Sequence, residues 1–279
     1  MQAVQRIKAM PRELGNEIRA PAIISALHTM VEELVMNSLD ADSKRIHVGL
    51  DFDLYGIEVR DDGKGIDLTK ASSTSEGNFG EWHCSSKKMS DSQDTFGFRG
   101  EAVAAISTLA DVSVTSKQEG GTTMRRGSSS PRFFPPDIDG PSGTIMVCSA
   151  VFGKLVVRQK QIRASKEIAL TKLFLQKMSL LNHTVSWELM VRADNATKTV
   201  FSQRGAESVS ASFRSLHGVD VLNNMVPVEQ KEEGFHVTGL LSPPLPQFCH
   251  WTKEYQYFYL GKRWMRGKDV VSVLMNKAY

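Results

Sequence analysis

The sequence predicts an α+β protein in which helices are layered on a sheet. Apolar residues recur at helical spacing over residues 22–39, and apolar and polar residues then alternate along the next segments, as in half-buried strands. Neighbouring strands follow one another like hairpins, without regular strand–helix–strand units. Together these observations favour an α/β sandwich.

Each element follows from its own pattern. After Pro21, Leu27, Leu34 and Val35 mark the apolar face of the first helix. We then expect strands at 46–52 and 57–59, a helix at 102–109, strands at 112–115 and 144–148, a helix capped by Ser165 that runs to 180, and strands at 185–191 and 199–201. Two segments lack periodicity, namely a long polar loop at 67–96 and a Gly-, Ser- and Pro-rich stretch at 119–143, predicted to be a flexible excursion.

A domain boundary is predicted within residues 203–207, which gives a first domain at 1–205 and a second at 206–279. The second domain should contain a short helix near 209–216, strands at 235–241 and 255–260, and a final helix at 269–275.

Composition limits the class of protein. The chain has 279 residues, of which 41% are hydrophobic and 23% charged, as in ordinary soluble globular proteins. A net charge of +3 does not by itself indicate a nucleic-acid binder. No apolar run approaches the roughly 20 residues of a membrane span, and the N-terminus lacks a signal-peptide core. Three cysteines without metal-ligand spacing fit a reducing, intracellular compartment.

The first candidate pair lies on the predicted helix 22–39. Glu33 and Asn37 are four residues apart and therefore emerge on one face. A carboxylate there can orient and deprotonate a water that attacks a γ-phosphate, and an amide oxygen suits magnesium. The alternative is that both are exposed polar residues of an amphipathic helix.

The second candidate is the segment RDDGKGI at 60–66. Asp61 ends a strand, and a buried carboxylate there can accept a hydrogen bond from the exocyclic amine of adenine. Gly63 and Gly65 let the backbone approach a flat base closely. A simple tight turn is the alternative.

The third candidate is GFRGEA at 97–102, which precedes an apolar helical run. Free amides at a helix start, reached through glycines, form an anion site, although simple helix initiation is the alternative. Ser86 and Lys87, in the polar loop before it, could touch phosphates once that loop closes as a lid. The predicted phosphate-binding set is Ser86, Lys87, Gly97, Phe98, Arg99, Gly100, Glu101 and Ala102.

The ordered motifs E-x-x-x-N, D-x-G-x-G, GFRGEA and GT (143–144) together resemble the GHKL ATPases. GFRGEA in particular resembles the MutL family of DNA mismatch-repair proteins, as do NSLDAD at 37–42 and HCSSK at 83–87. Gyrase-type topoisomerases, the large heat-shock chaperone and sensor histidine kinases use a different third motif.

The resemblance implies a Bergerat-type ATP-binding sandwich followed by a smaller transducer domain of ribosomal-protein-S5-like type. It implies ATP and magnesium as cofactors, with Glu33 as general base and Asn37 as metal ligand. Asp61 and Gly65 would bind adenine, and Thr144 would support that pocket. The implied partners are DNA, bound independently of its sequence, a second MutL-type subunit and a MutS-type mismatch-recognition protein.

Some positions depart from the family pattern. The stretch VEELVMNSLDA most resembles the third eukaryotic MutL homologue, the meiosis-associated branch. Trp82 and Ser85 alter the lid, and GKLVVRQKQI replaces the usual stretch after Phe152. The chain stops at Tyr279, before the lysine that reaches the γ-phosphate in relatives, so we expect an N-terminal fragment or isoform, truncated within the transducer domain, with weak turnover.

Two basic clusters are candidate DNA contacts, because such clusters displace counterions from phosphates. The alternative is an ordinary solvated surface. The clusters contain Lys154, Arg158, Lys160 and Arg163 in the first domain, and Lys262 and Arg263 in the second.

The sequence thus predicts an ATP-gated clamp on DNA that hydrolyses ATP slowly, acting in the nucleus if the source is eukaryotic. The alternative is a nucleotide-responsive, non-hydrolysing subunit of a MutL-type heterodimer. A chaperone or kinase relative is disfavoured by the GFRGEA motif.

Overall fold

A computed structural model of the chain describes residues 11–68, 96, 101–243, 245, 248 and 254–265. The chain divides into two compact units, Met1–Thr171 with Leu189–Val200, and Lys172–Glu188 with Phe201–Tyr279. Among the described residues, no helix has both the length and the apolar character needed to cross a membrane.

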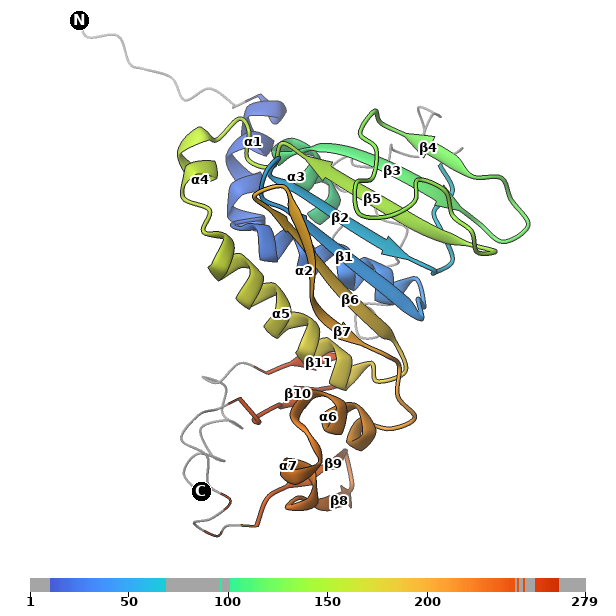
Figure 1. The fold of residues 1–279 in the computed structure, drawn as a ribbon, viewed down its shortest axis with the longest axis vertical. Helices are drawn as coiled ribbons and strands as arrows, with labels where there is room; N and C mark the ends of the chain where they lie inside the picture. Colours follow the sequence, from blue (N-terminus) through green and yellow to red (C-terminus); the bar gives the residue numbers. More distant parts are fainter. Residues whose placement is uncertain are drawn as a thin grey trace, which may run out of the picture. The chain divides into compact units, whose positions relative to one another are not determined.

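A seven-stranded sheet forms the main framework, in the order β4-β3-β5-β2-β1-β6-β7 (Figure 1). The neighbouring pairs among β1 to β5 are antiparallel, as the hairpin-like pattern predicts. The strands are β1 (Arg45–Asp51), β2 (Gly56–Asp61), β3 (Asp111–Lys117), β4 (Met124–Arg126), β5 (Gly143–Ser149), β6 (Ser186–Ala193) and β7 (Ala196–Gln203).

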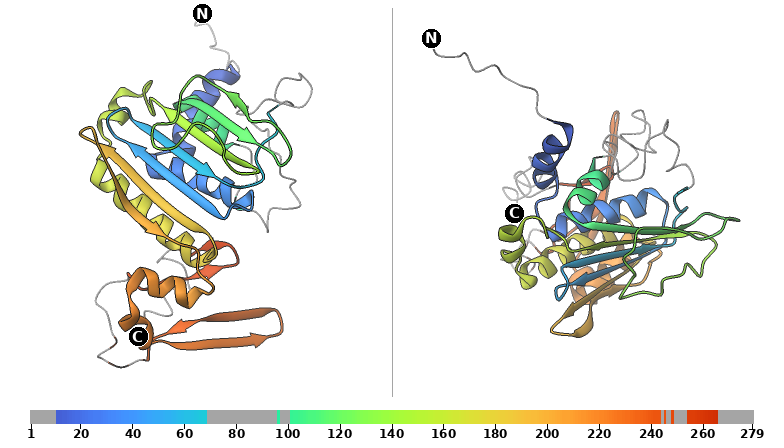
Figure 2. Two further views of the ribbon diagram at one scale, coloured as in Figure 1. Left: turned by 45° about the vertical axis from the view of Figure 1, so that its right-hand side comes forward. Right: turned by 90° about the horizontal axis from the view of Figure 1, so that it is seen from above.

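Helices cover one face of this sheet in the first unit (Figure 2). They are α1 (Arg12–Ile23), α2 (Leu27–Asp40) and α3 (Ala102–Leu109), and two further helices follow, α4 (Val156–Lys160) and α5 (Ala164–Leu181). Helix α2 buries Met30, Val31, Leu34 and Val35, each at most 2% exposed. The apolar residues at helical spacing in the sequence therefore form its buried face.

The alternation along β2 separates two environments. Ile57 and Val59 point to the buried helix side with Asp61, because alternate residues of a strand face the same way. Glu58 and Arg60 point to the opposite face, where they contact the chain between β4 and β5. One strand thus places charged groups on both faces of the sheet.

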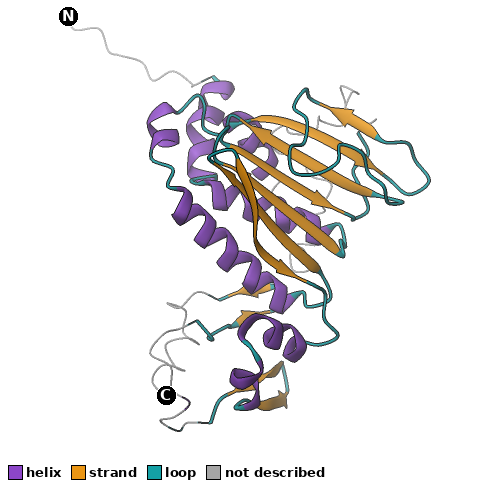
Figure 3. Cartoon of the chain, in the orientation of Figure 1, coloured by secondary structure: helices purple, strands orange, loops and turns teal. Residues whose placement is uncertain are grey.

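The stretch predicted to be a flexible excursion instead packs across this second face (Figure 3). We call residues 127–142 the strap. Its Phe133 amide donates to the Glu58 carboxylate, and the Phe133 ring lies where a side chain at Gly49 would have to be. Strap residue Ile138 joins the buried apolar cluster of the β5 residues Ile145 and Val147. Composition indicated mobility here, but these contacts fix the strap on the sheet.

The second unit contains two short helices and two hairpins. Ser208 caps α6 (Val209–His217) by accepting a hydrogen bond from the Ala211 amide. Inside the unit, the Gln203 side chain bonds both the Ser179 and the Ser212 hydroxyls. The other elements are α7 (Val219–Asn223), the antiparallel pair β8 (Val226–Glu232) and β9 (Phe235–Leu241), and the hairpin β10 (Tyr259–Leu260) and β11 (Arg263–Trp264).

Most predicted elements are confirmed within a few residues. Helix α1 was missed, because Pro21 suggested a start where the chain already completes a helix. Ser165 lies inside α5, so its predicted role as the cap is wrong. The predicted helix at 269–275 and residues 69–95 of the polar loop lie outside the described residues. The boundary near 205 and the ribosomal-protein-S5-like type of the second domain stay predictions.

Candidate nucleotide site

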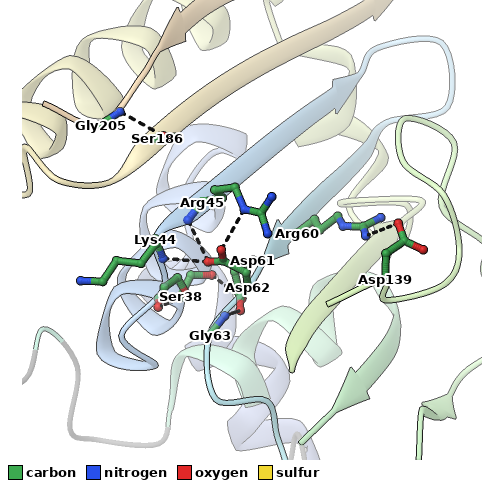
Figure 4. Close-up of polar contacts among 11 residues, drawn as sticks. Ser38, Lys44, Arg45, Arg60, Asp61, Asp62, Gly63, Asp139, Ser186 and Gly205 are labelled. Atoms are coloured by element: carbon green, nitrogen blue, oxygen red, sulfur yellow. Dashed lines mark hydrogen bonds and ion pairs between the residues drawn. The ribbon is translucent and has the colours of Figure 1, made fainter. Parts of the chain in front are cut away.

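Asp61 occupies the end of β2 against α2 (Figure 4). The Ser38 hydroxyl donates to Asp61 Oδ2 at 2.7 Å, and the Gly63 amide donates to Oδ1 at 2.9 Å. Ser43 supports this arrangement, because its hydroxyl donates to the Ser38 carbonyl at 2.6 Å. A carboxylate can accept about four hydrogen bonds, so both oxygens can receive further donors.

The pKa values of Asp61 and its neighbour Asp62 are shifted in opposite directions. Burial raises the pKa of Asp61 above its usual range, and the hydrogen bonds from Ser38 and Gly63 only partly offset that rise. Burial also acts on Asp62, but the side chain and amide of Arg45 and the amide of Lys44 outweigh it, so the pKa of Asp62 is lowered. Asp62 is thus a structural acceptor that fixes the start of β1, whereas Asp61 is directed into the site.

The glycine positions after Asp61 are required by space and by backbone shape. A Cβ on Gly63 would lie 2.6 Å from the Ser43 hydroxyl and 2.7 Å from the Ala41 side chain. Gly65 adopts φ +74°, and a Cβ there would overlap the Lys117 carbonyl oxygen. This loop therefore packs closely against Ala41, Ser43 and β3. The predicted close approach of its glycines to an adenine base stays a prediction.

A row of polar residues extends from Asp61 across the sheet. Thr144 on β5 is the register partner of Asp61, and Ser116 on β3 is the partner of Thr144. The Ser116 and Thr144 hydroxyl oxygens are 3.4 Å apart. We call Asp61, Thr144 and Ser116 the inner row. The predicted support of the Asp61 pocket by Thr144 thus has a geometric basis, and Ser116 is a member that motif reasoning missed.

The α2 residues Glu33 and Asn37 lie on one helical stripe with Asp40, since α2 is continuous from Leu27 to Asp40. Glu33 and Asn37 are half-buried. The Phe96 amide donates to Asp40 Oδ1 at 2.9 Å. The chain at Phe96, directly before GFRGEA, is therefore attached to α2 about one turn beyond Asn37.

The start of α2 is capped from a distant helix. Ala26 has no side chain that could cap it, and the Glu167 carboxylate of α5 instead accepts from the His28 amide at 2.9 Å and contacts His28 Nδ1 at 2.8 Å. Burial would raise the pKa of Glu167, but the bonds from His28 outweigh it and the pKa is lowered. This contact fixes the helix that carries Glu33 and Asn37. The local sequence at the helix start could not predict it, because the capping carboxylate comes from a distant segment.

The helix after GFRGEA begins as predicted, with Glu101 as its N-cap and Ala102 as its first residue. The Glu101 carboxylate pairs with Arg19 of α1 at 2.7 Å and makes no capping bond within α3. The negative charge of Glu101, next to the predicted anion site, is thereby balanced by the Arg19 cation. The other phosphate-site candidates lie outside the described residues: Ser86, Lys87, Gly97, Phe98, Arg99 and Gly100.

Within the described part of the chain, no three His, Cys, Asp or Glu side chains gather as a ready metal cage. Magnesium does not need such a cage, because it is commonly held by one or two protein oxygens together with substrate phosphates and water. Asn37 would supply such an oxygen.

Comparisons with known proteins agree with this geometry. Residues 24–129 match the family described as histidine kinase-, DNA gyrase B-, and HSP90-like ATPase. DNA mismatch repair protein MutL of Pseudomonas aeruginosa is 29% identical over an alignment that spans 100% of this chain and 44% of the relative. MutL of Dictyoglomus turgidum is 27% identical over 96% of this chain and 46% of the relative.

The chain is thus similar to MutL proteins over almost its whole length. Its fold is that of the GHKL ATPase domains, and the solved N-terminal domain of a DNA repair protein matches it with a TM-score of 0.65, at 20% identity, over 90% of this chain and 78% of that one. The Aquifex aeolicus MutL ATPase domain complexed with ADP matches with a TM-score of 0.59, at 18% identity, over 92% and 89%. The chain spans less than half the length of the curated MutL relatives named above.

The basic residues that were predicted to contact DNA differ in their surroundings. Arg158 on α4 donates to the Pro21 carbonyl at 3.0 Å, and its guanidinium lies 5.5 Å from the centre of the Phe152 ring. That side chain therefore has a structural role. Lys154, Lys160 and Arg163 are exposed.

The second cluster lies on the tight β10–β11 hairpin, where Lys262 is exposed. Beside it, Lys177 Nζ lies 3.3 Å from the centre of the Trp264 ring. Arg263 lies on β11, and its side chain is outside the described part of the structure.

Proposed function

We propose that this chain binds ATP with magnesium, hydrolyses it slowly, and acts as the nucleotide-gated part of a MutL-type clamp on DNA in mismatch repair. One observation carries the proposal. A half-buried carboxylate, Asp61, is held by a hydroxyl and an amide at the end of a central strand, against the helix that bears Glu33 and Asn37.

Each residue of the site has a distinct task in this proposal. Asp61 accepts the exocyclic amine of adenine, a match that the guanine carbonyl cannot make. Glu33 orients the attacking water and takes its proton, and Asn37 offers its amide oxygen to magnesium. Bound magnesium would offset charge on the phosphates, and the backbone amides of 97–102 would supply hydrogen-bond donors to them.

The clamp hypothesis extends this site to partners. ATP would shift the population of the polar loop and the N-terminal arm toward a closed state, in which two MutL-type subunits associate on DNA. A MutS-type protein would recruit them, and a eukaryotic chain would act in the nucleus. The relatives named as DNA mismatch repair proteins support this role. The stretch VEELVMNSLDA favours the third eukaryotic homologue, so meiotic recombination is a related setting.

A second candidate function is a non-hydrolysing, nucleotide-responsive subunit of a heterodimer. The same pocket supports it, because Asp61 and the glycine loop concern adenine binding and not turnover. Glu33 separates the two functions, since only hydrolysis needs a general base.

The test measures magnesium-dependent ATP hydrolysis and binding of a non-hydrolysable analogue. The variants are Glu33→Ala, Asp61→Asn and the control Glu32→Ala, which removes the preceding carboxylate from the same helix. We expect Glu33→Ala to bind the analogue normally and to lose at least about 100-fold in hydrolysis, as for removal of a general base. Glu32→Ala should retain hydrolysis, and Asp61→Asn should lose binding.

The outcomes separate the candidates. Binding without hydrolysis by the wild-type chain would favour the non-hydrolysing subunit. Equal loss of hydrolysis in Glu32→Ala and Glu33→Ala would argue against Glu33 as the base. Absence of binding by the wild-type chain would remove the proposed function.

A further inference from the structure

We infer that Ser116 is a positioning residue of the adenine pocket, which holds the glycine loop and the Thr144 hydroxyl in register with Asp61. This inference rests on the proposed function, because it assigns a role within the same site. Ser116 lies on β3, outside all four sequence motifs, and is only 1% exposed.

The first argument is position. Asp61, Thr144 and Ser116 are successive register partners on β2, β5 and β3. Partners directly opposite one another in a sheet face the same way, so all three side chains point to the helix-covered face. Asp61 confirms this direction through its bond with Ser38 of α2.

The second argument is the use of the Ser116 hydroxyl. Its oxygen accepts the Ile66 amide at 2.7 Å, which ties the loop after Gly65 to β3. Its single proton can go to the Gly143 carbonyl at 3.1 Å or to Thr144 Oγ1 at 3.4 Å. The shorter distance favours Gly143, and this choice lets the Thr144 hydroxyl direct its own proton toward Ser116 or toward a bound base.

The third argument is space. The glycine loop packs so closely on β3 that a Cβ at Gly65 would overlap the Lys117 carbonyl and lie 3.2 Å from the Ser116 hydroxyl. The Ser116 side chain is therefore one wall of the loop that follows Asp61. Loss of its hydroxyl would leave the Ile66 amide without this acceptor and loosen the loop, with no direct effect on Glu33.

The same strand offers a matched control. Ser113 is also buried, at 3% exposed, and its hydroxyl accepts one amide, from Ser129 at 2.8 Å. It lies three residues from Ser116 and thus on the opposite face, toward the strap. Ser113→Ala and Ser116→Ala remove the same group from the same strand at similar burial.

The experiment measures the affinities of a non-hydrolysable ATP analogue and its GTP counterpart, with hydrolysis rates and thermal stability in parallel. For Ser116→Ala we expect about tenfold weaker ATP-analogue binding and a narrower preference for ATP over GTP, with kcat nearly unchanged. Ser113→Ala should keep wild-type affinity and preference. Ser116→Thr retains the hydroxyl and should recover most of the affinity.

Wild-type affinity and preference in Ser116→Ala would overturn the inference, as would equal losses in Ser116→Ala and Ser113→Ala. Absence of nucleotide binding by the wild-type chain would defeat the proposed function instead. If Ser116→Ala does not fold, hydrogen exchange of the Ile66 amide in the wild-type chain decides. Protection that increases with ADP supports the inference, and rapid exchange in the presence of ADP overturns it.

Discussion

The two faces of the central strands carry parallel rows of polar residues that are satisfied in different ways. On the outer face, Glu58 of β2 accepts amides of Arg132 and Phe133, and Ser113 of β3 accepts the amide of Ser129, so the strap supplies the donors. On the inner face, Asp61 is held by one hydroxyl and one amide. The outer row is thus closed by the chain itself, whereas the inner row retains capacity for a ligand.

Burial raises the pKa of both Glu58 and Asp61, yet the consequence differs. For Glu58 the next contributions are two backbone amides of the strap, which lower the pKa and belong to the fold. For Asp61 the opposing groups are chiefly the Ser38 hydroxyl and the Gly63 amide. A raised pKa alone therefore does not identify a functional carboxylate. The distinguishing feature is whether the fold itself supplies all the hydrogen-bond donors to that carboxylate.

The comparison predicts that changes on the inner side reduce nucleotide binding and that changes on the outer side reduce stability. The largest effect is expected from Gly65→Ala, which combines a left-handed backbone with a collision at the Lys117 carbonyl. We expect a loss of roughly 2–5 kcal/mol in the free energy of unfolding, and loss of nucleotide binding. Chemical denaturation and analogue binding would check both.

Gly120→Ala is the control for Gly65→Ala. Gly120 has a similar φ of +71°, but nothing lies within 4 Å of a Cβ built there. It should lose only about 1 kcal/mol, the cost of the backbone conformation. Similar losses at the two glycines would show that the close approach of the loop to β3 does not matter.

The next effect concerns Glu58→Gln. The amide group can accept only one of the two strap amides and presents a donor to the other, so we expect about 2–3 kcal/mol of lost stability. Nucleotide affinity should stay within about twofold of wild type, because that carboxylate faces away from the site. A large loss of affinity with unchanged stability would reverse the assignment of the two faces.

Stability should depend on pH in opposite directions for Glu58, whose pKa is raised, and for Asp62, whose pKa is lowered. The pKa of Glu58 is raised from 4.5, so its favourable contribution is present below that pH and is lost as pH rises through the raised value. The pKa of Asp62 is lowered from 3.8, so its contribution is present above that pH and is lost on acidification below it. The free energy of unfolding of wild type should therefore exceed that of Glu58→Gln most at low pH, and that of Asp62→Asn most at higher pH. Differences that do not change with pH would contradict the assignment.

The smallest effect is expected for DNA binding. Lys160→Ala should lower the slope of log affinity against log salt by about 0.9 if this lysine meets a phosphate. Arg158→Ala should change the slope less and stability more, because that guanidinium bonds the Pro21 carbonyl and lies on Phe152. Equal slopes for both variants and wild type would remove α4 from the DNA-contacting surface.

Much of this architecture could be predicted from short-range patterns. The apolar spacing of α2 and the alternation of β1 and β2 specify which faces are buried, and Asp61 follows a strand within a glycine-rich segment. These features depend on neighbours within a few residues, which is the range that periodicity and turn chemistry describe.

The missed features depend on partners far apart in the sequence. Ser116 acts through Ile66, 50 residues away, and Glu167 caps α2 through His28, 139 residues away. The strap was predicted to be flexible because its composition is that of a loop, but Glu58 on a distant strand binds its backbone. A single sequence carries no signal for such pairs, since each residue type is ordinary in its own segment.

The central claim is that the inner row forms an adenine pocket centred on Asp61. Calorimetric titration of magnesium ADP into the wild-type chain, Asp61→Asn and Ser113→Ala tests it most directly. The account predicts saturable binding by wild type and Ser113→Ala, and a loss of at least about 100-fold in Asp61→Asn, because the asparagine presents a donor where Ser38 or the adenine amine also donates. Wild-type affinity in a folded Asp61→Asn would contradict the account.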